Sequence, residues 1–160
     1  MAHQNEIEKI SLLQAESDIT RLINSYPYLL DSGKFSDVAE LLRHATLEVP
    51  GHQIKGWNEI ENFLSSGIQQ HQDSTPRTWH AVSNTLVEVT PLSGEASATS
   101  YFTVHQELPG FPLQPICTGH YKDRFALIDG EWQFVHRSVE PHLMGDIRFH
   151  VSGANAEANL

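Results

Sequence analysis

Asp31 and His80 are the two residues whose types and positions best suit acid–base chemistry in this chain of 160 residues. Asp31 follows the apolar run Tyr28-Leu29-Leu30 at the predicted end of a helix, where the helix dipole disfavours an unpaired carboxylate. His80 alternates onto the same face of a predicted strand as Val82 and Leu86, which favours partial burial. An imidazole titrates near neutral pH and acts as a general base when a carboxylate orients it.

Both residues also have simpler structural explanations. A half-buried histidine on a strand is often a core residue that hydrogen-bonds to the backbone. An aspartate after a helix is often a turn residue that accepts hydrogen bonds from its own backbone. The pattern of residues leaves these alternatives open for His80 and Asp31 alike.

Arg137 interrupts an otherwise apolar run between Phe134-Val135 and Val139. It is either a surface or edge-strand cation, or a fixed positive charge that stabilises an anionic intermediate or leaving group. Cys117 has no base beside it in the sequence and is expected to be a packing residue. No serine lies in a Gly-x-Ser-x-Gly nucleophile elbow.

Several histidines could in principle bind a metal: His80, His105, His120, His136, His142 and His150. None of them shows a His-x-x-x-His or His-x-x-Glu-x-His spacing, and the single cysteine excludes a Cys-x-x-Cys pair. Strand histidines can still converge without a motif. The sequence predicts neither a metal nor a cofactor.

The composition indicates one acidic globular domain. The formal net charge is −10 and 39% of the residues are hydrophobic. Nucleic acids and anionic membranes bind basic patches, so neither is an expected partner. One cysteine, no apolar signal segment at the start and no run of about 20 apolar residues predict a soluble cytoplasmic protein.

The order of predicted elements favours an α+β fold. Apolar residues recur at helical spacing before a series of longer segments that are typical of strands. Pro27 is expected to kink or break the first helix, and Ser36 and Asn58 are expected to cap the next two. The predicted helices are 11–30, 36–43 and 58–69; the predicted strands are 46–49, 77–90, 95–106 and a hairpin over 117–140. Residues 1–150 form one domain in this interpretation, and residues 151–160 are a disordered tail.

Asp129-Gly130 predicts the tip of the hairpin, because both positions of a tight turn need a positive φ angle that these residues tolerate. With a two-residue turn, Phe125 faces Phe134, Asp123 faces His136 and Lys122 faces Arg137. A bulge would shift this pairing and turn Arg137 to the other face of the sheet. The sequence does not decide between these registers.

The chain resembles the SnoaL-like branch of the nuclear transport factor 2-like superfamily over about residues 11–150. The resemblance is carried by the order and spacing of several segments: Asp-Ser-Gly-Lys-Phe at 31–35, Lys-Gly at 55–56, Thr-Trp-His-Ala-Val-Ser-Asn at 78–84, the strand 96–104, Gly-His-Tyr-Lys-Asp-Arg-Phe at 119–125, Asp-Gly-Glu-Trp at 129–132 and Gly-Asp-Ile-Arg-Phe-His at 145–150.

The resemblance implies a cone-shaped, curved mixed β-sheet packed on about three helices, a cystatin-like α+β barrel that encloses an apolar pocket. The family includes cofactor-free enzymes such as scytalone dehydratase, bile-acid 7α-dehydratase, lindane dehydrochlorinase and polyketide cyclases. It also includes the β subunits of ring-hydroxylating dioxygenases, which share the fold and lack the catalytic centre.

The family's eliminating enzymes use an Asp–His pair whose positions match Asp31 and His80. Their catalytic Arg matches Arg137, and Tyr26 stands where they carry a catalytic Tyr or Lys. The chain departs from the family at His120, which replaces the Arg of a Gly-Arg-Tyr segment. Side chains expected to line the substrate pocket are Trp57, Phe63, Phe102, His105, Tyr121 and Met144.

These residues predict a cofactor-free lyase or isomerase, similar to a dehydratase, that removes a proton from an apolar, ring-containing small molecule. The alternative is a non-catalytic small-molecule binder or an accessory subunit similar to the dioxygenase β subunit. Apolar residues on both faces of 95–106 predict a homodimer or homotrimer packed through the sheet.

Overall fold

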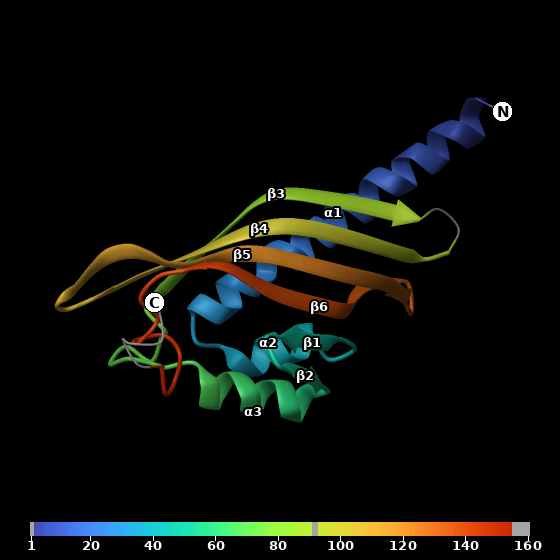
Figure 1. The fold of residues 1–160 in the computed structure, drawn as a ribbon. Coiled ribbons are helices and arrows are strands. Elements are labelled where there is room, and N and C mark those ends of the chain that lie inside the picture. Colours follow the sequence, from blue (N-terminus) through green and yellow to red (C-terminus); the bar gives the residue numbers. More distant parts are fainter. Residues whose placement is uncertain (1, 91–92, 155–160) are drawn as a thin grey trace.

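The computed structural model describes residues 2–90 and 93–154, and it contains three helices and six strands within those ranges. The α+β prediction is confirmed: three helices pack on a curved, mixed sheet (Figure 1). The elements are α1 (Ala2–Asp31), α2 (Phe35–Leu41), β1 (Thr46–Val49), β2 (His52–Lys55), α3 (Trp57–Gly67), β3 (Thr78–Thr90), β4 (Glu95–Leu108), β5 (Phe111–Ile128) and β6 (Glu131–Met144).

The sheet has the strand order β2-β1-β6-β5-β4-β3 and does not close into a barrel. Neighbouring strands are antiparallel except for β1 and β6, which run parallel. The short strand β2 was not predicted, because His-Gln-Ile-Lys has a single apolar residue and no alternation. The order leaves β3 at an edge of the sheet, beside α1 (Figure 1).

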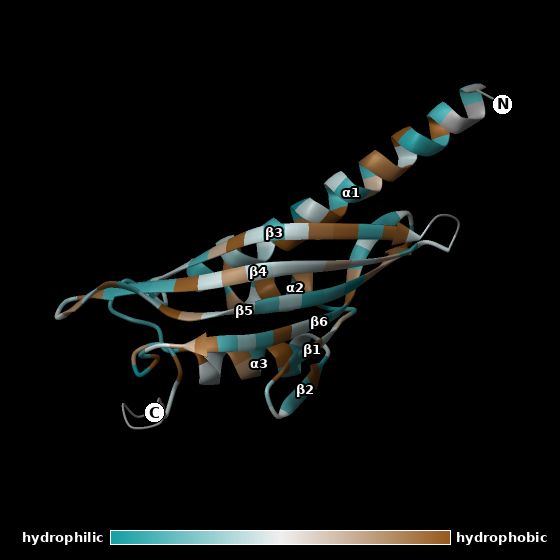
Figure 2. Ribbon diagram, turned by 45° about the horizontal axis from the view of Figure 1, so that its top comes forward, coloured by the Kyte–Doolittle hydropathy of each residue, from teal (hydrophilic) through white to brown (hydrophobic). Residues whose placement is uncertain are grey.

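Helix α1 crosses one face of the sheet and then extends past its end (Figure 1). Its second half buries Ile19, Ile23 and Leu30 in the core. The projecting half shows alternating hydrophobic and hydrophilic bands (Figure 2). The expected break at Pro27 does not occur, because burial of the residues on both sides outweighs the one missing backbone hydrogen bond.

The predicted caps of α2 and α3 are wrong. Helix α2 begins at Phe35 after Lys34, and α3 begins at Trp57 after Gly56, without a side-chain cap in either case. Gly56 has a φ angle of 85°, a backbone conformation that glycine adopts at little cost. Asn58 therefore lies inside α3 rather than before it.

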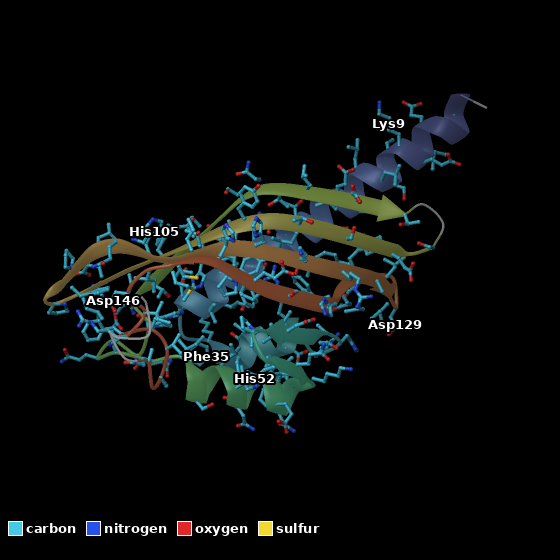
Figure 3. The ribbon with its side chains drawn as sticks, viewed as in Figure 1. Lys9, Phe35, His52, His105, Asp129 and Asp146 are labelled. Atoms are coloured by element: carbon cyan, nitrogen blue, oxygen red, sulfur yellow. The ribbon has the colours of Figure 1, made fainter. Side chains whose placement is uncertain are left out.

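The hairpin of β5 and β6 turns at Asp129 and Gly130, whose φ angles are 52° and 85°, as predicted (Figure 3). Phe125 pairs with Phe134, but a bulge at Val135 shifts the register beyond it. Asp123 consequently pairs with Arg137, whereas an unbulged hairpin would place it opposite His136. The bulge turns Arg137 to the inner face of the sheet.

Strand β3 carries a second bulge, at Asn84, which has a φ angle of 52°. His80 and Val82 face the interior before this bulge. Leu86 follows it and faces outward, with 70% of its surface exposed. The prediction that His80, Val82 and Leu86 share one face is therefore wrong for Leu86, because the extra residue reverses the alternation.

The connection between β4 and β5 is shorter than the gap between the predicted strands 95–106 and 117–140. Only Pro109-Gly110 separates β4 from β5, since β5 tolerates Pro112 and Pro115 next to register shifts. The predicted disordered tail is partly ordered, because Val151 forms a bridge with Ile68 and the Ser152 N–H donates to Gly67 O. Residues 155–160 of that tail, and residues 91–92 between the predicted strands 77–90 and 95–106, lie outside the described residues.

Candidate active site

Asp31 projects from the last turn of α1 toward the start of β3 and accepts three hydrogen bonds there. Its Oδ1 lies 2.5 Å from His80 Nδ1 and 2.7 Å from Thr78 Oγ1, and its Oδ2 lies 2.8 Å from the His80 backbone nitrogen. The turn itself is stabilised by other groups, such as the Ser32 hydroxyl bonded to Tyr28 O. Asp31 is therefore a partner of β3 and not a self-bonded turn residue.

The three hydrogen bonds keep Asp31 ionised. Burial on its own would raise the pKa of Asp31, but the bonds from His80 and Thr78 outweigh it and hold that pKa below its usual value. An ionised carboxylate can only accept a hydrogen bond, so the Nδ1 atom of the neutral His80 ring carries the proton. Nε2 is then the basic nitrogen. The arrangement prepares His80 to accept a proton.

His80 is one of the residues that line a groove of about 640 Å³ between α1 and the edge strand β3. The His80 side chain is 5% exposed and that of Asp31 18%, so the pair lies deep in this groove. A volume of several hundred cubic ångströms is typical of small-molecule sites. The groove is lined by Asn24, Pro27, Tyr28, Asp31, Ser32, Thr78, Trp79, His80 and Val82.

His150 packs against His80, with the two ring centroids 6.2 Å apart. It belongs to the segment after β6, whose backbone is held by side chains from elsewhere: His71 Nε2 and Gln106 Nε2 both donate to Phe149 O, at 2.9 and 3.0 Å. The His150 Nδ1 atom is buried without a hydrogen-bond partner among the described residues. His150 is thus a buried neighbour of His80 that does not line the groove.

Burial, helped by the neighbouring His80 and His71 and opposed by Asp31, lowers the pKa of His150 to about 4. The unfolded chain takes up a proton at His150 near pH 6.5, whereas the folded chain does so only near pH 4. Stability is therefore lost as the pH falls from 6.5 to about 4. The difference corresponds to roughly 3 kcal/mol.

We expect His150→Phe to remove this acid-sensitive contribution. Urea unfolding at pH 7 and pH 4.5 should show a smaller loss of stability for the variant than for the wild type. The exposed His52 on β2 supplies the matched control, His52→Phe, which should keep the wild-type pH dependence. An equal loss in the wild type and in His150→Phe would contradict the prediction.

A model of the SnoaL-like domain matches residues 11–138. The chain belongs to the SnoaL-like domain family. The match includes the whole groove, with Asp31 and His80, but not the closing segment that carries His150. A comparison with curated proteins gave no match.

Solved structures share the fold of this SnoaL-like domain at low sequence identity. An NTF2-like protein with a cystatin-like fold from Novosphingobium aromaticivorans has a TM-score of 0.70 and 20% identity, over 97% of this chain and 93% of that one. A putative scytalone dehydratase from the same organism has a TM-score of 0.68 and 19% identity, over 86% of this chain and 91% of that one. The β subunit of a putative aromatic-ring-hydroxylating dioxygenase, again from that organism, has a TM-score of 0.68 and 14% identity, over 88% of this chain and 97% of that one. These likenesses establish the fold.

Arg137 lies in the interior of the SnoaL-like domain and is fully buried. Its Nε and Nη2 atoms donate to Oδ1 and Oδ2 of Asp123 at 2.9 and 2.8 Å, while Nη1 has no partner among the described residues. The guanidinium carbon lies 4.3 Å from the ring centroids of Tyr26 and Tyr121 and 4.7 Å from that of Phe134. Burial alone would lower the pKa of Arg137, but Asp123 raises it above its usual value.

Of the two alternatives predicted for Arg137, the surface or edge-strand cation is wrong, because the side chain is fully buried. The charge is compensated by Asp123, and neither Arg137 nor Tyr26 lines the groove. Tyr26 is buried on the inner face of α1, edge-on to Tyr121, and burial raises its pKa. The structure therefore brings Asp31 and His80 together, and it places Tyr26 and Arg137 in the core.

The predicted pocket residues are scattered and do not line the groove. Phe102 and Tyr121 stack on each other in the core, with centroids 4.6 Å apart. Trp57 begins α3 and is 40% exposed, and Phe63 packs against His52. Other predicted lining residues lie away from the interior: His105 is on the side of the sheet opposite α2 and α3 (Figure 3), and Met144, near Cys117, is 47% exposed.

Sequence reasoning did not assign roles to several residues at the site. Thr78 donates a hydrogen bond to Asp31, and Tyr28 and Trp79 line the groove. All three lie within three residues of Asp31 or His80 in the sequence. Their nearness to Asp31 and His80 was the available signal. Asp123 gave no such signal, because only the bulge brings it to Arg137.

Two further findings concern the described residues alone. Among them, no group of three or more His, Cys, Asp or Glu side chains is arranged to hold a metal ion. Within the same ranges, no helix is long and apolar enough to cross a membrane.

Proposed function

We propose that this SnoaL-like domain is a lyase or isomerase that removes a proton from carbon without a cofactor. The observation that carries the proposal is the Asp31–His80 pair, whose facing atoms lie 2.5 Å apart deep in a groove of about 640 Å³. A carboxylate that orients a histidine beside a ligand-sized space is the arrangement that general base catalysis requires.

In the proposed reaction His80 Nε2 accepts a proton from a carbon next to a carbonyl or beside a leaving group. The electron pair of the broken C–H bond forms an enolate or a new C=C bond. In an isomerisation His80 returns the proton to another carbon; in a dehydration it gives the proton to the departing hydroxyl, which leaves as water. Asp31 stabilises the imidazolium that exists between these steps.

Tyr26 and Arg137 enter this proposal as positioning residues. Tyr26 lies five residues before Asp31 on α1, and the Arg137–Asp123 pair packs against its ring. A fixed Tyr26 sets the depth and rotation of the last turns of α1 against the sheet. That placement in turn fixes the Asp31 carboxylate against His80.

Hydrogen–deuterium exchange tests the proposed function without knowledge of the substrate. Cyclic ketones are incubated with the protein in D₂O, and proton NMR follows loss of the signal from the hydrogens next to the carbonyl. We expect at least one ketone to exchange faster with the wild type than with His80→Ala. No protein-dependent exchange across a panel that includes mono-, bi- and polycyclic ketones would count against a proton-abstracting enzyme.

A non-catalytic binder or accessory subunit is the second candidate. The observation that favours it is the compensated charge of Arg137, which leaves no free Arg facing the groove among the residues that line it. The structural likeness to a putative dioxygenase β subunit fits the same reading. This candidate predicts ligand binding in the groove with no exchange in D₂O.

We also propose that the chain forms a homodimer or homotrimer through the outer face of the sheet. Large apolar side chains lie exposed there, including Tyr101 at 50% and Leu86 at 70%. Tyr101 contacts His120, and His120 lies near His142 on the neighbouring strand. Exposed aromatic clusters of this kind are typical of interfaces.

Sedimentation velocity at micromolar concentration checks this assembly. The wild type should sediment as a dimer or trimer, and Tyr101→Glu should shift it toward the monomer by placing a charge in the contact. A wild-type monomer of about 18.0 kDa would contradict the proposal. An oligomer that Tyr101→Glu leaves intact would place the interface on another surface.

A further inference from the structure

The projecting half of α1 exposes an apolar stripe that consists of Ile7, Ile10 and Leu13. Their side chains are 48%, 60% and 57% exposed, and Ala15 is the first buried side chain among those described on this helix. The first turns of α1 stand away from the sheet in Figure 1, and Lys9 marks this projecting part in Figure 3. A helical segment gains most of its stability from packing of an apolar face, so this stripe is typical of a surface that binds a partner.

The stripe lies on the side of α1 that faces away from the core. An α-helix turns by about 100° per residue, which places the stripe roughly opposite to the positions of Ile19 and Ile23. Ile19 and Ile23 are fully buried in the core. The helix therefore has two separate apolar surfaces, one for its own fold and one that projects into solvent.

The residue types on this outward side of α1 are symmetric about Ile10. Polar residues continue the stripe at both of its ends: His3, Glu6, Gln14 and Ser17. When two such helices pair antiparallel with Ile10 against its own copy, Ile7 meets Leu13 of the second copy. Glu6 then meets Gln14 of the second copy. A two-fold dimer requires this property, because each contact between two different residues occurs twice with the roles exchanged.

The charges also favour a second copy of the chain as the partner. The formal net charge is −10, so two copies repel unless they meet on a nearly uncharged surface. Glu6 is the one carboxylate on this side of the helix, and antiparallel pairing places it against the Gln14 amide. A lipid surface is disfavoured, because interfacial helices carry Lys and Arg on their polar face. Here Glu8 and Glu16 outnumber Lys9.

We propose that the apolar stripe joins two copies of this chain through an antiparallel α1–α1 contact centred on Ile10. This contact is separate from the one on the outer face of the sheet, because Ile10 and Tyr101 belong to different elements. It also goes beyond the proposed function, since no residue of the stripe lines the groove. The contact is small, so it should be weaker than the sheet contact and should double the size of the assembly only at higher protein concentration.

Sedimentation velocity of the full chain, from micromolar to several hundred micromolar, tests the contact. Ile10→Glu and Ile10→Lys each bring like charges together across the two-fold axis, and each should raise the Kd for doubling about tenfold or more. An equal mixture of the two variants should regain the doubling, because Glu then meets Lys. Lys9→Gln changes the net charge by as much as Ile10→Glu but lies beside the stripe, so it should keep the wild-type behaviour. Circular dichroism checks that each variant is folded.

Disulfide cross-linking tests the register of the two helices. In a Cys117→Ser background, which leaves no other thiol, Ile10→Cys should cross-link to its own copy under mild oxidation. Ile7→Cys should cross-link efficiently only when it is mixed with Leu13→Cys. Cross-linking of Ile10→Cys that persists together with Tyr101→Glu would support a contact separate from the sheet.

Several results would overturn the proposal. One is a wild-type assembly whose size does not rise with concentration, and another is a doubling that Ile10→Glu leaves unchanged. A mixture of Ile10→Glu and Ile10→Lys that does not regain the doubling would overturn it too, as would equal cross-linking of Ile7→Cys and Ile10→Cys alone. Binding of the wild type, but not of Ile10→Glu, to phosphatidylcholine vesicles without any doubling in solution would instead assign the stripe to a lipid surface.

Discussion

Arg137→Met is expected to lower the free energy of unfolding by roughly 3–5 kcal/mol. Arg137 and Asp123 form a bidentate ion pair whose side chains are 0% and 1% exposed. Methionine fills a similar volume but leaves the Asp123 carboxylate buried without a cation. The folded state must then desolvate a bare charge or protonate Asp123, and both cost stability. Urea unfolding followed by circular dichroism measures the loss.

A double variant separates the lost ion pair from lost packing. Asp123→Leu/Arg137→Met removes both charges and should recover most of the stability, because apolar pairs of similar volume often replace buried ion pairs at little cost. Lys122→Met provides an exposed control, since the Lys122–Glu140 pair is 60% and 41% exposed and should contribute less than about 1 kcal/mol.

The result also decides between two roles for Arg137. A stable Arg137→Met variant that has lost proton exchange would restore Arg137 to the catalytic role that the family resemblance implies. A destabilised variant whose folded fraction still exchanges protons would leave it a structural residue. A loss below about 1 kcal/mol would mean that the Asp123 pairing contributes little in solution.

His80→Ala is expected to slow proton exchange roughly 10²–10⁴-fold, the usual contribution of a positioned general base. The variant keeps the groove but has no nitrogen to accept the proton. Asp31→Asn should slow exchange less, because the imidazole remains while its orientation and its charge partner are weakened. The measured quantity is the rate of exchange in D₂O for the best ketone, with the fold checked by circular dichroism.

The exposed His52, on β2, supplies the control for this series. His52→Ala should catalyse ketone exchange at the wild-type rate. That result would show that losing any one histidine does not by itself slow the exchange. If His80→Ala keeps its rate within a few-fold of wild type, the Asp31–His80 pair is not the base. If it exchanges slowly only because it is unfolded, His80→Gln, which retains a polar side chain of similar length, must show the same loss while folded.

The sequence alone predicted the parts of this protein that depend on local preferences. Apolar spacing located all three helices, although their caps were wrong because Lys34 and Gly56, not Ser36 and Asn58, precede α2 and α3. Asp129-Gly130 located the hairpin tip, since a tight turn needs a positive φ angle at both positions. Family resemblance, rather than any local pattern, paired Asp31 with His80.

The tertiary structure decided where each strand contains an extra residue, and so on which face of the sheet the later side chains lie. The bulge at Val135 turns Arg137 inward onto Asp123, and the bulge at Asn84 turns Leu86 outward. Whether a strand bulges depends on how its neighbours and the helix beneath it pack, and neither bulge has a distinctive sequence signal. The same holds for His150, which reaches His80 because Gln106 and His71, from distant parts of the chain, hold its segment there. Residue types could therefore indicate the chemistry of the Asp31–His80 pair, while long-range packing alone determined that the pair faces a groove and that Arg137 does not.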